Sequence, residues 1–153
     1  MFFKKKKEVF QMPMKGTLID ISTIDDEVFS KKIMGDGIAI RPSSKEVYAP
    51  YSGKITTCFP TKHAYGITTN SGTEILIHLG VDSLYHKDAF ICHCKEGDRI
   101  KQGQLLCEYN YEVIKSEGKE HACLVVFLSG EALKDIPYGE VDNNQKASII
   151  EGE

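Results

Sequence analysis

Short runs of apolar and β-branched residues, separated by turn-forming residues, recur along most of the chain. Apolar and polar side chains alternate in the run Glu74–Leu79, which places Ile75, Ile77 and Leu79 on one face of a strand. Turn formers such as Asn70-Ser71-Gly72 separate successive runs, because glycine reaches positive φ without steric cost. Strands are expected at 17–21, 37–40, 54–59, 66–69, 74–79, 90–94, 105–109 and 124–128. The pattern predicts an all-β protein.

Helical periodicity is scarce. Two short helical turns are expected at the periphery, at 26–34 and 111–117. Residues 12–18 and 49–55 share a Pro-x-x-Gly pattern that leads into a strand, which indicates a weak internal repeat. Residues 96–106 resemble the hairpin of barrel-sandwich hybrid domains, and 147–150 could add a last strand. We therefore expect a single-domain antiparallel β-sandwich or barrel of duplicated hybrid-motif type.

The size and charge of the chain exclude several classes of protein. Its 153 residues, 41% of them hydrophobic, suit one compact domain at 11–153 after a basic N-terminal tail at 1–10. The formal net charge of -3 supplies no field for a polyanion, so nucleic acid is not an expected partner. No stretch has the ~20 apolar residues of a membrane span, and no apolar segment of signal-peptide type follows the lysines at 4–7.

The five cysteines are odd in number and include no Cys-x-x-Cys pair. This usage is typical of reduced cysteines in a cytoplasmic protein, the location that we expect. Cys92-His93-Cys94 could look like a metal motif, but on a strand His93 points away from the two cysteines. We therefore do not expect a structural zinc site there.

Two histidines fifteen residues apart suggest a single chemical site. His78 falls on the polar side of the alternating run, opposite the aliphatic face, and His63 precedes the neighbouring expected strand. Imidazole changes charge near neutral pH and can act as a nucleophile. A histidine on a strand is often only structural, so the pair is a hypothesis that further motifs must support.

Several motifs occur together and in order. They are Val28-Phe29, Ile33-Met34-Gly35-Asp36-Gly37-Ile38-Ala39-Ile40, Tyr48-Ala49-Pro50, Gly53, Phe59-Pro60-Thr61-Lys62-His63-Ala64, Glu74-Ile75-Leu76-Ile77-His78-Leu79-Gly80-Val81-Asp82 and Glu96-Gly97-Asp98. Together they resemble glucose-type enzyme IIA of the bacterial phosphotransferase system, over about residues 12 to 130. The chain departs from the family pattern at 84–90, where we expect a turn of different shape. It also departs at 122–130, where the family motif gives no support for the last strands.

The resemblance implies a phosphocarrier that accepts a phosphoryl group from HPr and passes it to a cysteine of an enzyme IIB sugar-transporter domain. It implies that His78 is phosphorylated on Nε2, with the Gly80 carbonyl holding the other ring nitrogen as a donor. His63 would donate to a phosphoryl oxygen, and Thr61 would orient His63. Regulated metabolic enzymes or permeases are further expected partners, because a phosphorylated docking face is a binding switch.

The resemblance also implies a docking rim around the histidines. Its apolar members are Val28, Phe29, Ile33, Met34, Phe59 and Leu76. Its acidic members are Asp26 and Asp82, which would meet basic residues of the partners. Such a rim suits a surface that docks several proteins and excludes water during transfer.

No cofactor is required by this interpretation, although His63 and His78 could bind zinc at an interface where a partner supplies a carboxylate. Two alternatives remain. A lysostaphin-type zinc peptidase needs a His-x-His pair, whereas His78 is flanked at two positions by Leu76 and Gly80; only the His-x-x-x-Asp half is matched, by Asp82. The second is a regulatory module that keeps the fold and the rim but relays no phosphate. It is disfavoured only because the chain has both histidines, Thr61 and Asp82.

Overall fold

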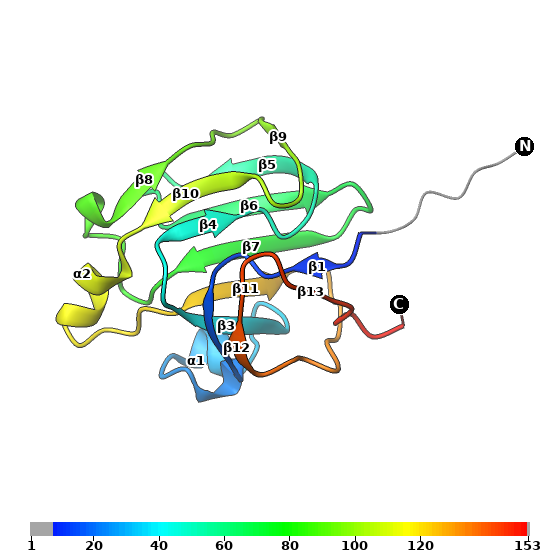
Figure 1. The fold of residues 1–153 in the computed structure, drawn as a ribbon, viewed down its shortest axis with the longest axis horizontal. Coiled ribbons are helices and arrows are strands. Elements are labelled where there is room, and N and C mark those ends of the chain that lie inside the picture. The colour runs from blue at the N-terminus through cyan, green and yellow to red at the C-terminus, as the bar shows by residue number, and fades with distance from the viewer. Residues whose placement is uncertain (1–7, 153) are drawn as a thin grey trace, which may run out of the picture.

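The computed structural model describes residues 8–152 and shows an antiparallel β-protein (Figure 1). An eight-stranded sheet has the order β12-β2-β3-β11-β7-β6-β5-β9, a three-stranded sheet has the order β4-β10-β8, and β1 pairs with β13. The strands are β1 (Phe10–Gln11), β2 (Gly16–Ile19), β3 (Gly37–Pro42), β4 (Glu46–Tyr48), β5 (Gly53–Cys58), β6 (Ala64–Thr69), β7 (Glu74–Leu79), β8 (Phe90–Cys92), β9 (Arg99–Ile100), β10 (Leu105–Tyr109), β11 (Cys123–Phe127), β12 (Gly139–Val141) and β13 (Lys146–Ala147). The predicted all-β sandwich-like class is confirmed.

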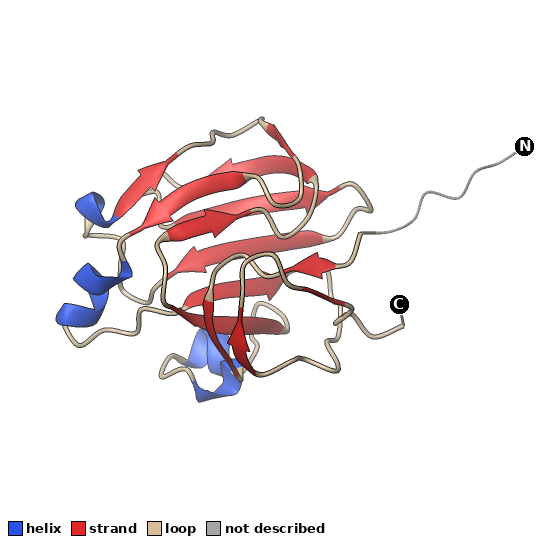
Figure 2. Cartoon of the chain, viewed as in Figure 1, coloured by secondary structure: helices blue, strands red, loops and turns tan. Residues whose placement is uncertain are grey.

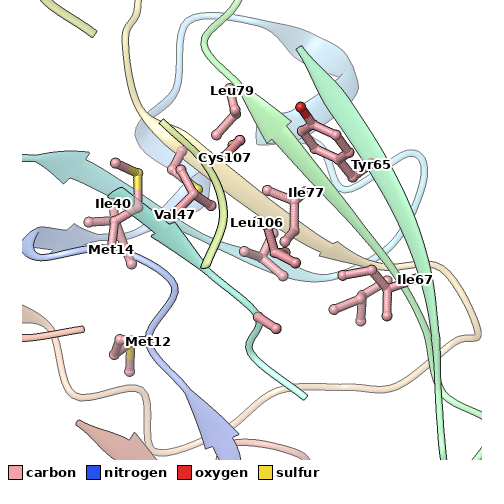
Figure 3. Close-up of a cluster of buried hydrophobic side chains, with 14 of the residues drawn as sticks. Met12, Met14, Ile40, Val47, Tyr65, Ile67, Ile77, Leu79, Leu106 and Cys107 are labelled. Carbon is pink, nitrogen blue, oxygen red and sulfur yellow. The ribbon is translucent and has the colours of Figure 1, made fainter. Parts of the chain in front are cut away.

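The alternation along β7 builds the main core. Ile75, Ile77 and Leu79 are fully buried, as the pattern predicted, while the alternate positions are more exposed. Side chains from both larger sheets pack together in this core, and Figure 3 shows Val47 of β4 and Leu106 of β10 among residues of the large sheet. Burial of these aliphatic chains is the main force that holds the two sheets together.

Helices lie only at the periphery of the described chain (Figure 2). They are η1 (Ile21–Thr23), α1 (Glu27–Ser30), η2 (Lys87–Ala89) and α2 (Tyr111–Ser116). The two predicted helical turns correspond to α1 and α2. The Asp26 side chain caps α1 by accepting a hydrogen bond from the Val28 N–H at 3.0 Å, and Phe29 of α1 packs into a second, smaller apolar cluster over β3 and β11.

The structure corrects two sequence-based expectations and confirms a third. Phe10 is fully buried in β1, so the fold begins before residue 11; the lysines at 4–7 lie outside the described residues. The predicted strand at 147–150 is wrong, because β13 ends at Ala147 and Ile150 forms only an isolated bridge with Leu133. The strand expected at 124–128 is confirmed despite the departure from the family pattern at 122–130, since β11 pairs with both β3 and β7 at the centre of the large sheet.

Candidate functional site

The β6–β7 hairpin brings the two histidines together. Its register pairs Ala64 with His78, and His63 lies one residue before Ala64. The Leu79 N–H donates to the His63 carbonyl at 2.7 Å, which extends the pairing to this end of the hairpin. The ring centroids of His63 and His78 are 5.0 Å apart with the ring planes nearly perpendicular, at 84°. Two residues fifteen positions apart thus form one site.

A backbone carbonyl determines the tautomer of His78. Its Nδ1 lies 2.7 Å from the Gly80 carbonyl oxygen, and a carbonyl can only accept, so Nδ1 carries the proton. Nε2 of the neutral ring is then left with a free lone pair. Gly80 has φ of 76°, in the left-handed region that glycine adopts without penalty. The turn after β7 therefore presents a carbonyl to the side chain two residues before it.

Side chains of the loop between β5 and β6 hold His63. The Thr61 hydroxyl lies 2.5 Å from His63 Nδ1, and the Phe59 ring meets the imidazole edge-on at a centroid distance of 5.5 Å. The loop is closed by a hydrogen bond from the Lys62 N–H to the Phe59 carbonyl at 2.7 Å, with Lys62 at φ of 62°. His63 is only 7% exposed, so its ring is held in one orientation.

Both histidines are neutral at neutral pH. Burial, and to a smaller extent the nearby His78, lowers the pKa of His63 to about 4. Burial also lowers the pKa of His78, although the hydrogen bond to Gly80 and the charge of Asp26 oppose this shift. A neutral imidazole is the form that can act as a nucleophile at Nε2.

Part of the expected rim surrounds the histidines directly. The Phe29 ring lies 5.1 Å from the His78 ring, centroid to centroid, and Met34 and Leu76 pack against the cluster that contains Phe29. Asp26 is near enough to His78 to act on its charge. The rim residues Val28 and Ile33 are 42% and 66% exposed.

Asp82 lies two residues after Gly80, at φ of 54°. Its side chain is exposed, and its backbone carbonyl accepts a hydrogen bond from Lys119 Nζ at 3.1 Å. The Asp82 backbone is thus tied to the segment after α2.

Two residues that the sequence interpretation missed support the Gly80 turn. The Ser83 hydroxyl is buried and donates to the Leu79 carbonyl at 2.5 Å. The Tyr109 hydroxyl donates to the His121 carbonyl at 2.9 Å, and it lies only 2.8 Å from where a Cβ on residue 80 would be. A small hydroxyl residue just after Gly80-Val81-Asp82 was the available signal for Ser83; no local pattern pointed to Tyr109, which comes from β10.

Comparison with known proteins identifies the family. The family model for the EIIA 1 domain of the phosphoenolpyruvate-dependent sugar phosphotransferase system matches residues 8–133. The chain belongs to this family. The solved structure of glucose permease IIA from Mycoplasma capricolum matches with a TM-score of 0.85 and 35% sequence identity, over 97% of this chain and 99% of that chain.

As a member of this family, the enzyme IIA described here is a phosphocarrier of the phosphotransferase system, with HPr and enzyme IIB as its general classes of partner. The family resemblance noted from the sequence is confirmed, and the peptidase alternative is not supported. Among residues 8–152, no helix has the length and apolar character needed to cross a membrane.

Proposed function

We propose that this enzyme IIA accepts a phosphoryl group on Nε2 of His78. The observation that carries the proposal is the 2.7 Å hydrogen bond from His78 Nδ1 to the Gly80 carbonyl, which leaves Nε2 as the free nucleophile. The lowered pKa of His78 keeps that lone pair available at neutral pH. The nitrogen needs no separate base, because it has no proton to lose.

The transfer then needs little besides alignment. The Nε2 lone pair attacks phosphorus as the bond from phosphorus to the phosphohistidine nitrogen of HPr breaks, and that nitrogen recovers its electron pair. In the second transfer, a cysteine thiolate of the enzyme IIB domain attacks phosphorus, and the bond to Nε2 of His78 breaks. Both steps are displacements in which positioning and charge stabilisation supply most of the catalysis.

We propose that His63 stabilises the transferring group. When the Thr61 hydroxyl donates to Nδ1 of His63, Nε2 carries the proton and can donate to a phosphoryl oxygen. The two rings lie nearly perpendicular with centroids 5.0 Å apart, so His63 is close enough to act on a group held by His78. Thr61 is thus a positioning residue that acts through His63.

The apolar rim serves docking in this proposal. Exposed Val28, Ile33 and Phe59 would be covered by HPr or enzyme IIB, while Asp26 and Asp82 would meet basic side chains at the edge. Covering the rim excludes water from the phosphohistidine during transfer. We place this exchange in the cytoplasm, and regulated metabolic enzymes or permeases are further candidates for the same face.

Zinc is not required for this chemistry. His63 and His78 would offer two Nε2 atoms, because Thr61 and Gly80 engage the other ring nitrogens. Among residues 8–152, no group of three His, Cys, Asp or Glu side chains is arranged to hold a metal ion. A zinc ion at this pair would therefore need further ligands from a docked partner.

Intact-mass analysis after incubation with phosphoenolpyruvate, enzyme I and HPr tests the proposal. One acid-labile phosphoryl group is expected on the wild-type protein and none on His78→Ala. His63→Gln should still accept the group but transfer it poorly to enzyme IIB, which separates the two histidines. Phosphorylation of a folded His78→Ala protein would reject the assignment, and a folded wild-type protein that takes no phosphate from active HPr would favour a binding-only role.

A further inference from the structure

The peptide group that joins Gly80 to Val81 is hydrogen-bonded at both ends. Its carbonyl oxygen accepts the 2.7 Å hydrogen bond from His78 Nδ1. Its N–H donates to the Glu120 carbonyl at 2.9 Å. A peptide group is planar, and in the trans form found here its carbonyl and its N–H point in opposite directions. The Glu120 carbonyl therefore helps to fix the direction in which the Gly80 carbonyl faces His78.

The segment that leads into β11 pairs with the same turn at a second point. The Gly80 N–H donates to the Ala122 carbonyl at 2.9 Å, two residues after the bond to Glu120. The side chains of Val81 and Ala122 are both buried in the smaller apolar cluster. Residues 80–81 are thus held against residues 120–122, and the placement of the Gly80 carbonyl depends on the order of that segment.

An ion pair with β3, which lies beside β11 in the large sheet (Figure 1), orders residues 120–122. Nη2 of Arg41 lies 2.8 Å from Oε1 of Glu120, and Nε makes a longer contact of 3.4 Å to Oε2. Oε2 also accepts a hydrogen bond from the Ala122 N–H at 3.2 Å. The Glu120 side chain is only 14% exposed, so water competes weakly for its oxygens, although the Arg41 side chain is 48% exposed.

The Glu120 carboxylate keeps its charge in this pair. Burial acts to raise the pKa of Glu120, but the hydrogen bond and charge of Arg41, and the hydrogen bond from Ala122, hold that pKa below its ordinary value. The carboxylate is therefore ionised at neutral pH and depends on Arg41 to remain where it is, because a charge that is largely buried needs a partner.

We propose that Arg41 and Glu120 are positioning residues for phosphoryl transfer, which act through the peptide group between Gly80 and Val81 on the imidazole of His78. The inference rests on the proposed role of His78 as the acceptor. Hydrogen bonds in a chain polarise one another, so the bond to the Glu120 carbonyl makes the Gly80 carbonyl a stronger acceptor. A stronger acceptor holds the proton on Nδ1 and raises the electron density at Nε2, the attacking atom.

Removal of either side chain should weaken this chain of hydrogen bonds. Without Arg41, the unpaired carboxylate of Glu120 turns toward water and leaves the Ala122 N–H. Residues 120–122 then hold the turn less firmly, and His78 populates its other tautomer, in which Nε2 carries the proton and cannot attack. Loss of a group that orients a functional imidazole typically costs 10- to 100-fold in activity, so we expect acceptance of phosphate to slow on the order of tenfold.

Nuclear magnetic resonance of the full chain, labelled with ¹⁵N and not phosphorylated, tests the inference without any transfer reaction. In the wild type, the ring signals of His78 should identify a protonated Nδ1 and an unprotonated Nε2; His78→Ala assigns these signals. In Glu120→Ala and Arg41→Ala the two signals should move toward each other as the second tautomer appears. Unchanged signals in the folded variants would overturn the inference. If Glu120→Ala does not fold, Arg41→Ala decides, because half of that side chain is exposed.

The rate of phosphoryl acceptance, measured at increasing concentrations of phosphorylated HPr, gives the second readout. Arg41→Ala and Glu120→Ala should each lower the maximal rate on the order of tenfold, with the half-saturating concentration of HPr unchanged. Arg41→Lys keeps the charge but loses the two-point contact, so it should recover part of the rate. The matched control Glu108→Gln breaks the 2.8 Å pair with His93 on the three-stranded sheet and should behave as wild type.

The kinetic outcomes separate positioning from docking. The double variant should be no slower than the slower single variant, because both residues act as one unit. A raised half-saturating concentration at an unchanged maximal rate would overturn the inference and make the pair a direct contact of HPr. A wild-type protein that takes no phosphate, but whose His78 signals still respond to Glu120→Ala, would reject the role of His78 and leave the hydrogen-bond chain standing.

Discussion

Replacing Gly80 by alanine should destabilise the protein through two separable effects. Residue 80 has φ of 76°, where a side chain with Cβ costs roughly 1 kcal/mol more than glycine. The new Cβ would also lie 2.8 Å from the Tyr109 hydroxyl and 3.1 Å from the Ser83 Cβ. The hydroxyl must move, and its hydrogen bond to the His121 carbonyl is worth about 1 kcal/mol. We expect a total loss of about 2 to 3 kcal/mol in the free energy of unfolding.

A double-mutant cycle separates these effects. Tyr109→Phe removes the hydroxyl that the new Cβ would meet, but leaves the backbone strain at residue 80. Equilibrium unfolding in urea is measured for the wild type, Gly80→Ala, Tyr109→Phe and the double variant. The double variant should be more stable than the sum of the single losses predicts, by about 1 kcal/mol. Strict additivity, or a Gly80→Ala protein within about 0.5 kcal/mol of wild type, would refute the proposed close packing of this turn.

Three further predictions concern the site. Because the pKa of His63 falls from an ordinary 6.5 to about 4, the unfolded chain binds a proton that the folded chain does not, so stability should decline as the pH falls from 6.5 toward 4, by up to about 1.4 kcal/mol per pH unit. Urea midpoints across this range measure the decline, which should be weaker in His63→Gln. An equally steep decline in that variant would contradict the assignment of the pKa shift to His63. Thr61→Val should slow onward transfer to enzyme IIB on the order of tenfold while His78 still accepts phosphate, with Thr61→Ser close to wild type; equal rates for the two variants would exclude a role for the hydroxyl. Ser83→Ala should lower the free energy of unfolding by about 1 to 2 kcal/mol, because the Leu79 carbonyl loses its donor, and an unchanged urea midpoint would show that this bond contributes nothing.

The fold class followed from local patterning. In β7 the alternation of apolar and polar residues is clear, because one face packs in the core and the other does not. The very short strands β1, β9 and β13 escaped prediction, since two residues carry no detectable period. Phe10 shows the same limit: it follows a basic run in the sequence, and only its pairing opposite Ala147 shows that it belongs to the core.

The candidate site likewise has features that the sequence predicts and contacts that only the structure shows. The sequence by itself determined the family, the two histidines and the Thr61 and Gly80 positions, because these lie in short contiguous motifs whose spacing is set by one hairpin. Only the tertiary structure decided which atoms face one another: the Tyr109 hydroxyl over Gly80, and the Ser83 hydroxyl on the Leu79 carbonyl. The contact between Tyr109 and Gly80 depends on how strands distant in sequence pack, and that information is spread over the whole hydrophobic core, outside any local motif.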